Sequence, residues 1–288
     1  MKKKLLLLVF LMISHLIMAQ EKNRVGVLKG ACAIPFTYIL ANPLYEFTYY
    51  NSADEIAKAI KAGLIDVTNI SSVAAEKLVT QLKGQVSVSA VTSNTGFCII
   101  TSDGDLTSFS GLLGKQVHIV KDSLADKLFS FLLEKNSIPV RSDEVGVEIV
   151  YDDNNSEIIA GLNSGLYEYA VLAEPYISSV LTNSKRKYAA IDLQDEYQKI
   201  YGSDKVIPQT VLLVLSQFEN NYTSDYVRLK YDIQNSIRKV KSQPVDAANV
   251  LNENKIGVSP FYSAKIISKL FLCYSENTKS DFTLSLGM

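Results

Sequence analysis

Short apolar runs alternate with capped amphipathic stretches along most of the chain. The runs at 25–30, 46–51 and 64–71 have the composition of strands. The stretch after the second run carries apolar residues at helical spacing, behind a capping box formed by Ser52 and Glu55. This alternation predicts an α/β fold in which a parallel sheet is covered by helices on both faces.

One extended segment, residues 86–103, is too long for a strand of average length and is interrupted at 94–96. It predicts a strand that leaves one domain and enters a connection to another. The strand and helix alternation then restarts. Further strands are expected at 117–120, 147–152, 167–174, 187–193 and 208–216. The last of these is apolar enough to be buried on both faces, as in the centre of a parallel sheet.

The remaining residues predict helices. Ser224 is expected to cap a long helix with Val227 and Tyr231 on its apolar side, and a last helix is expected to start at Ser259 and run through Cys273. No solenoid repeat and no low-complexity linker interrupts the pattern. Two α/β lobes joined without a flexible linker are expected to enclose something between them.

The first nineteen residues have the pattern of an export signal. Three lysines precede the apolar run Leu5–Met18, and a small residue stands before Gln20. The run is shorter than the roughly 20 residues that span a bilayer, so we expect residues 1–19 to be cleaved. The first cysteine is Cys32, which leaves no lipid acceptor near the cut. These features favour an unanchored protein held in the periplasm by an outer membrane.

Net charge, the numbers of cysteines and histidines, and the motifs that are missing argue against several classes of function. Cleavage would move the net charge from −1 to −4, and no basic face for nucleic acid is indicated. Three cysteines, Cys32, Cys98 and Cys273, allow at most one bridge in any of three pairings, and buried free thiols are the favoured reading. His118 would be the single histidine left, inside a predicted strand. No nucleophile elbow and no zinc spacing is found, so we expect neither an enzyme nor a metal or other cofactor.

Six segments resemble, in order and spacing, the exported substrate-binding proteins of ABC importers. They are similar to the group that contains nitrate, sulfonate and thiamine-pyrimidine binding proteins. The matching segments are 25–40, 50–78, 90–104, 131–138, 169–181 and 191–214. None of them is a catalytic signature, so the resemblance lies in their order.

The resemblance implies a two-lobed type II periplasmic-binding fold, in which the chain crosses twice between lobes and closes on a ligand by hinge bending. Lobe one would comprise 20–104 plus 210–288, and lobe two 105–209, with the second crossing near Gln209. It also implies a monomer that binds a small-molecule solute and passes it to an ABC permease and its ATPase.

In such sheets, ligands bind beyond the carboxyl ends of the strands, where helix N-termini face the cleft. This rule selects Lys29, Gly30, Asn69, Ser71, Ser72, Thr92, Ser93, Asn94, Lys121, Ser123, Glu174, Tyr176 and Gln209, to which Phe36 is added as the best aromatic candidate. The ammonium groups of Lys29 and Lys121 could bind an anionic group of the ligand or could simply be exposed to solvent. Glu174 could accept from a ligand amine, but the structural role of starting a helix is favoured. Phe36 could stack on a ligand or lie in the core.

The chain departs from the resemblance in two loops. The segment 120–126, VKDSLAD, lacks the glycine-rich turn often found at the helix start of lobe two, and 69–71 lacks a proline. The nature of the ligand therefore stays open among thiamine-pyrimidine precursors, sulfonates, nitrate-like anions and other metabolites. We expect a periplasmic receptor for a small polar, anionic or amphipathic metabolite. The alternatives are an exported sensor module and an enzyme on the same fold that acts on a small ring compound.

Overall fold

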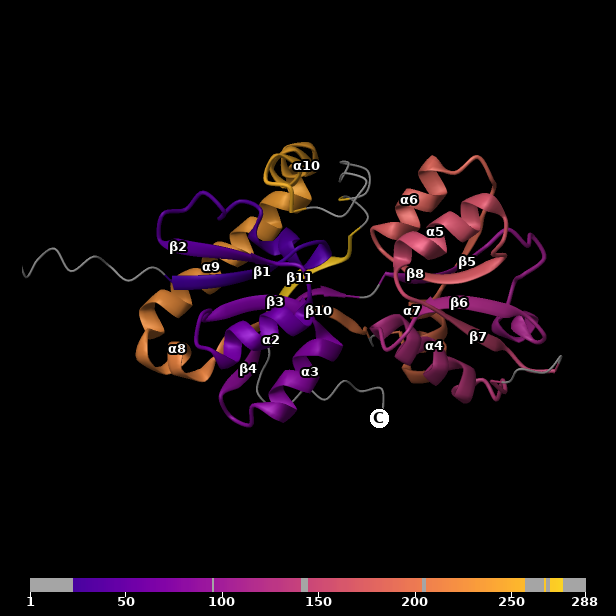
Figure 1. Cartoon of the computed structure of the whole chain (residues 1–288), viewed down its shortest axis with the longest axis horizontal. Coiled ribbons are helices and arrows are strands. Elements are labelled where there is room, and N and C mark those ends of the chain that lie inside the picture. The colour runs from indigo at the N-terminus through magenta and orange to yellow at the C-terminus, as the bar shows by residue number, and fades with distance from the viewer. Residues whose placement is uncertain are drawn as a thin grey trace, which may run out of the picture.

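The chain forms two lobes, each built around its own β-sheet (Figure 1). The computed structural model describes residues 23–94, 96–140, 145–203, 206–256, 267 and 270–276. The predicted signal peptide and the start of the predicted last helix at Ser259 lie outside these residues. Among the described residues, no helix combines the length and the apolar character needed to cross a membrane.

The first lobe contains a six-stranded sheet in the order β11-β4-β10-β3-β1-β2. Its strands are β1 (Asn23–Leu28), β2 (Tyr45–Tyr50), β3 (Val67–Ser71), β4 (Val86–Asn94), β10 (Pro208–Leu215) and β11 (Leu272–Glu276). Its helices are η1 (Ala31–Phe36), α2 (Ala53–Lys61), α3 (Ser72–Gln81), α8 (Ser216–Asn221), α9 (Thr223–Ser242) and α10 (Pro244–Glu253). Two apolar clusters form its core, one under α9 and α10 and the other under α2 and α3.

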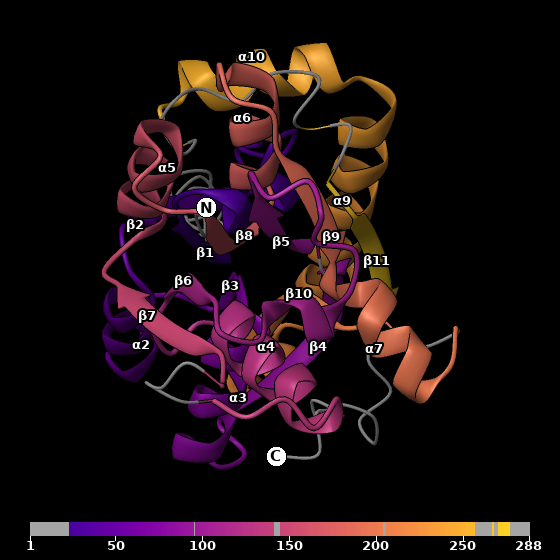
Figure 2. The same cartoon turned by 90° about the vertical axis from the view of Figure 1, so that its right-hand side faces the viewer.

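The second lobe contains a five-stranded sheet in the order β7-β6-β8-β5-β9. Its strands are β5 (Phe97–Thr101), β6 (Gln116–Val120), β7 (Glu148–Asp152), β8 (Tyr169–Ala173) and β9 (Ala189–Asp192). Its helices are η2 (Phe109–Leu112), α4 (Leu124–Lys135), α5 (Asn155–Ser164), α6 (Tyr176–Asn183) and α7 (Leu193–Tyr201). Figures 1 and 2 show α5 and α6 on one face of this sheet and α4 and α7 on the other, each pair over its own apolar cluster.

Local sequence signals account for the helix starts. At α2 the backbone amide of Glu55 donates to Ser52 Oγ at 3.2 Å, and Glu55 Oε2 accepts from the amide of Asn51 at 2.8 Å. The predicted capping box is therefore confirmed, with the glutamate reaching one residue further back. At α5 the cap is Asn154, whose side chain accepts from two backbone amides of the first turn. Its helix begins at the next residue, Asn155.

The chain passes between the lobes twice. The first passage lies between the end of β4 and the start of β5, and the second lies between α7 and β10. Strand β5 falls before the predicted boundary at residue 104, yet it pairs with β8 and β9 of the second lobe. The reason is that the long extended segment 86–103 divides at its interruption rather than at its end. The prediction of two lobes with two crossings is confirmed.

Both sheets are mixed, whereas the sequence pattern predicted parallel ones. Strand β10 is buried on both faces as expected, but it runs antiparallel to β3 and to β4. Strand β5 likewise runs antiparallel to β8 and to β9. Each of these strands enters its sheet from the other lobe, so it runs against the strands that end at that edge. A buried apolar run carries no signal of strand direction.

The C-terminal predictions need two corrections. Cys273 lies in strand β11, which pairs antiparallel with β4, and not in a helix. The spacing of apolar residues there fits a helix, but the free edge of the sheet offers the segment backbone partners. In α9, Val227 and Tyr231 are exposed at 55% and 60%, because the buried stripe runs through Leu229 and Ile233. Ser224 does not cap this helix, which begins one residue earlier.

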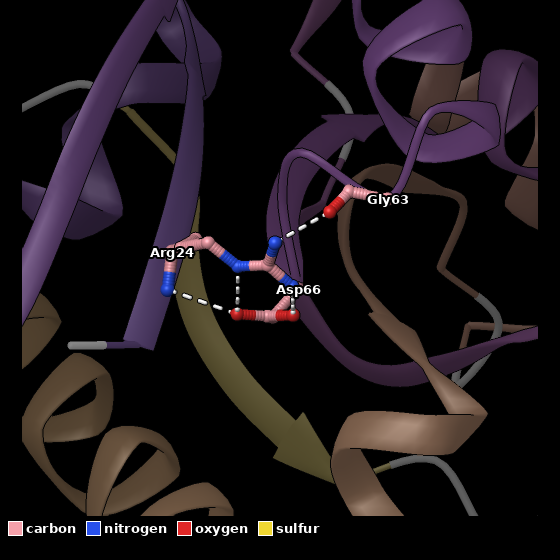
Figure 3. Close-up of polar contacts among 3 residues, drawn as sticks. All are labelled: Arg24, Gly63 and Asp66. Carbon is pink, nitrogen blue, oxygen red and sulfur yellow. Dashed lines mark hydrogen bonds and ion pairs between the residues drawn. The ribbon is translucent and has the colours of Figure 1, made fainter. Parts of the chain in front are cut away.

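An ion pair holds β1 to the turn that precedes β3 (Figure 3). Both terminal groups of the Arg24 guanidinium are engaged, one by the Asp66 carboxylate and the other by the carbonyl of Gly63. The Asp66 carboxylate also accepts from Nε and from the backbone amide of Arg24, each at 3.0 Å. This bidentate arrangement ties together two strands at the end of the sheet away from the second lobe.

Candidate functional site

Two sheet edges that carry predicted site residues face each other across the crossings. In the first lobe, β10 begins beside the carboxyl ends of β3 and β4, since Thr210 pairs with Ser71 and Pro208 with Asn94. In the second lobe, β5 begins beside the carboxyl ends of β8 and β9. Both crossings therefore join the edges at which strands of an open α/β sheet present their ligand loops.

Four buried side chains form a hydrogen-bonded row across the edge of the first sheet. Thr92 Oγ1 donates to Asn69 Oδ1 at 2.7 Å and lies 2.8 Å from Thr210 Oγ1, which lies 2.7 Å from Ser93 Oγ. Asn69 Nδ2 donates to the carbonyl of Cys32 at 2.9 Å. All four side chains are less than 9% exposed.

The protons in this row can be assigned by counting donors. Each hydroxyl has one proton, and Thr92 uses its own on Asn69. The bond to Thr92 therefore takes the Thr210 proton, and the bond to Thr210 takes the Ser93 proton. Each hydroxyl proton is thus used in a hydrogen bond within the protein. Thr92 and Ser93 are therefore suited to holding the strand ends together. Toward a ligand, their hydroxyl groups can accept a hydrogen bond but cannot donate one. Thr210 was missed by the sequence reasoning, which selected its neighbour Gln209; Thr210 is buried, whereas Gln209 is only partly buried.

The start of α3 holds a buried polar group that has no hydrogen-bond partner in the described part of the chain. Ser71 is the N-cap, and its Oγ accepts from the amide of Ala74 at 3.3 Å. The next residue, Ser72, is fully buried, and its hydroxyl makes no hydrogen bond to the described residues. A buried unpaired hydroxyl costs about 1–3 kcal/mol of stability relative to a paired one.

The segment after β1 carries three of the predicted solute-binding residues, Lys29, Gly30 and Phe36. Gly30 takes a left-handed conformation, with φ of 100°, and its buried amide donates to the carbonyl of Ile256 at 2.9 Å. Lys29 beside it is exposed. Phe36 was open to stacking on a ligand or to packing in the core, and it packs in the core, because η1 folds back over the sheet and buries this ring completely, 6.4 Å from the ring of Phe47.

The second lobe places Lys121 and Ser123 before α4. Lys121 is exposed, with Nζ 5.7 Å from the centre of the Tyr151 ring, and Ser123 Oγ accepts from the amide of Asp126 at 3.1 Å. Asp122 between them adopts φ of 56°. Aspartate tolerates this left-handed region better than most residues, so Asp122 supplies the turn for which the loop lacks a glycine.

Glu174 has the structural role favoured from the sequence. It is 8% exposed, and its two carboxylate oxygens accept from the amide and the hydroxyl of Ser178, at 3.1 and 2.8 Å, across the first turn of α6. Tyr176, which follows it, is half-buried, and burial raises the pKa of its phenol. Phe271, which sequence reasoning missed because a helix was predicted there, is 53% exposed and lies 3.1 Å from where a Cβ on Gly96 would stand.

His118 is packed, as the sequence indicated, within a cluster of three polar side chains. Its Nδ1 lies 3.0 Å from Asp152 Oδ2, and the Tyr167 hydroxyl donates to Asp152 Oδ1 at 3.0 Å. The rings of His118 and Tyr167 stack with centroids 3.4 Å apart. Within the described part of the chain, no group of three His, Cys, Asp or Glu residues is arranged to hold a metal ion.

None of the three cysteines forms a disulfide within the described residues, and all three are partly buried. Burial raises the pKa of the Cys32 thiol to about 12. At pH 8 about one Cys32 in ten thousand would then be a thiolate, which is the form that reacts with alkylating agents. We expect Cys32 to resist iodoacetamide in the native protein and to react in the unfolded protein, as measured by mass spectrometry of its peptide. Equal rates in the two states would contradict this assignment.

Solved structures share this fold at low sequence identity. Comparison with protein-family models and with curated proteins finds no match. An ABC transporter structure from Parabacteroides distasonis matches with a TM-score of 0.70 and 16% identity, over 88% of this chain and 86% of the other. The periplasmic aliphatic sulphonate binding protein of Escherichia coli matches with a TM-score of 0.67 and 13% identity, over 86% and 77%.

A third similar structure is the ligand-binding component of an ABC-type import system from Staphylococcus aureus, with zinc bound. It has a TM-score of 0.62 and 16% identity, over 90% of this chain and 87% of the other. At these identities the likeness concerns the fold. The two-lobed type II periplasmic-binding fold expected from the sequence is thereby confirmed.

Proposed function

We propose that this chain is a periplasmic solute-binding receptor of an ABC importer. The observation that carries the proposal is the pair of strand-end edges, which face each other and are joined by both crossings. A solute held between them would contact both lobes, so its binding would favour the closed arrangement to the extent of its differential affinity. The shared fold with proteins described as binding components of ABC import systems supports this role.

The proposed solute is a small polar metabolite, anionic or amphipathic. Three features support this class: the unpaired hydroxyl of Ser72, the exposed ammonium groups of Lys29 and Lys121, and the acceptor lone pair of Ser93 at the end of the buried row. The protein would act as a monomer, exported by a cleaved signal at residues 1–19. Its partners would be a permease and the ATPase that drives it.

A thermal-shift screen of the mature protein tests this role. A solute at 100 times its dissociation constant adds about 2.7 kcal/mol of stability, which for a chain of this size raises Tm by roughly 5 °C or more. For an anionic hit, we expect Lys29→Ala and Lys121→Ala to weaken binding, whereas Lys187→Ala, an exposed lysine after α6, should not. The proposal fails if hits are chemically transformed during incubation, or if no small polar metabolite shifts Tm.

The variant Ser72→Ala separates ligand contact from structural support. Because the hydroxyl is buried and unpaired, its removal should leave the free protein as stable or stabilise it by about 1 kcal/mol. If the solute bonds to this hydroxyl, its affinity should fall about tenfold. The matched control is Ser178→Ala, which removes a buried hydroxyl that donates to Glu174 and should destabilise the protein. Unchanged solute affinity in Ser72→Ala would remove this residue from the proposed site.

A further inference from the structure

A groove of about 500 Å³ runs between the two lobes, on the flank formed by α2 and α3. Both helices of the first lobe line it, and the turn Asp122–Leu124 of the second lobe closes its other side. In Figure 1, α3 lies on the side of its lobe that is turned toward α4. Of the residues predicted to bind solute, the groove includes Ser71 and Ser123 but neither Lys29 nor Lys121. None of the four side chains of the buried polar row lines the groove, although it reaches the carboxyl end of β3 at Ser71.

Three lysines, Lys58, Lys61 and Lys77, line this groove, against two aspartates, Asp54 and Asp122. All three lysines are exposed, and within the described residues their side chains make no ion pair or hydrogen bond. Lys58 and Lys61 lie in the last turn of α2, where a cation also complements the helix dipole. That structural role does not account for Lys77 in the interior of α3, which points into the same groove.

The floor of the groove depends on contact between the lobes. Val73, in the first turn of α3, packs against the apolar cluster of the second lobe, and it also lines the groove. The N-cap residues Ser71 and Ser123 stand on walls that belong to different lobes. Any hinge motion that separated the lobes on this flank would therefore pull the walls apart.

We propose that this groove docks an acidic segment of a protein partner, and that docking requires the lobes to be in the arrangement described. An ion pair between one exposed lysine and one carboxylate contributes only about 0–1 kcal/mol of binding free energy, so a solute with a single charge would be bound weakly here. A segment with several carboxylates can engage the three lysines together and be steered to them within the Debye length of about 10 Å. The partly exposed apolar side chains of Val73 and Ala74 would contact the segment between its charges. If the proposed importer role holds, the partner would be the permease.

The test uses the full mature chain and a fluorescent hexaglutamate peptide, with binding followed by anisotropy at low and high ionic strength. The combined variant Lys58→Glu, Lys61→Glu and Lys77→Glu is expected to bind the peptide at least about tenfold more weakly than the wild type. The matched control carries the same charge changes outside the groove, at Lys83, Lys185 and Lys187, and should bind like the wild type. Added salt should weaken binding to the wild type and to the control.

A second variant tests the dependence on lobe contact. Val73→Asn places an uncharged polar side chain against the apolar cluster of the second lobe, so it should weaken peptide binding although the charge of the groove is unchanged. Full affinity in Val73→Asn, or equal affinity of the groove variant and the control, would overturn the proposal. So would displacement of the peptide by inorganic sulfate at the same concentration of charge, because the groove would then be a site for small anions.

Solute binding gives an independent readout. The groove variant should keep the thermal shift produced by any solute found in the screen, since the lysines lie outside the strand-end site. A failed screen would refute the proposed receptor role and leave the peptide result unaffected. Loss of both binding activities in the groove variant would show that groove and solute site are one, against the inference drawn here.

Discussion

Replacing Gly161 with alanine is expected to lower the free energy of unfolding by about 3 kcal/mol, at the upper end of the cost of overpacking a core. A Cβ at this position of α5 would lie 2.2 Å from the nearest carbon of the Tyr167 ring, a separation at which something must move. The ring cannot shift freely, because it stacks on His118 and its hydroxyl donates to Asp152. The added methyl group therefore disturbs the whole polar cluster of the second lobe.

Thermal or urea denaturation followed by circular dichroism measures this loss. The matched control is Gly104→Ala, where a Cβ would meet nothing within 4 Å and where the backbone is not left-handed. This control should unfold within about 0.5 kcal/mol of the wild type. Unfolding of Gly161→Ala at the wild-type midpoint would show that the Tyr167 ring has room to rotate away, and that the stack is not tightly held.

Replacing Asp66 with alanine is expected to cost about 2 kcal/mol of stability. The carboxylate is buried and accepts three hydrogen bonds from Arg24, and breaking a buried pair from one side typically costs about 3–5 kcal/mol. The Arg24 side chain is 44% exposed, so water partly replaces the lost partner and the expected cost is smaller. The loss includes the acceptor of the Arg24 backbone amide, which anchors the start of β1.

The control for Asp66→Ala is a variant of a more exposed ion pair. Lys230 and Glu276 are 3.0 Å apart, and the Glu276 side chain is 61% exposed. Glu276→Gln should change the free energy of unfolding by less than about 0.5 kcal/mol, and its small effect should vanish in high salt. If Asp66→Ala were as mild as this control, the Arg24 pair would contribute no more than an ordinary surface contact.

Sequence patterns predicted the local elements because their causes are local. The capping box of Ser52 and Glu55 and the apolar face of α4 each depend on residues within two turns of one another. The overlong segment at 86–103 revealed a passage between lobes because its length exceeds that of a single strand. The resemblance to ABC importer binding proteins added the order of the lobes, which comparison with solved structures supports at the level of the fold.

Features that depend on the pairing of distant segments could not be predicted in this way. The direction of β10 follows from the lobe from which it arrives, and β11 is a strand because β4 offers it an open edge. The same limit applies to the site. Strand-end reasoning selected Asn69, Thr92 and Ser93, but two of the hydrogen bonds that engage Thr92 and Ser93 arise only when β10 brings Thr210 between β3 and β4.

The sequence by itself determined where most of the helices and strands begin and that the chain builds two α/β lobes, while the export signal at residues 1–19 stays a prediction. These properties follow from periodicity, capping and hydrophobic length, which act along the chain. Only the tertiary structure decided which side chains are free to meet a ligand. It buried Phe36 in the core, left the Ser72 hydroxyl unpaired and gathered three lysines on one interlobe groove. Burial and hydrogen-bond pairing depend on contacts between segments far apart in the chain, and no local pattern encodes them.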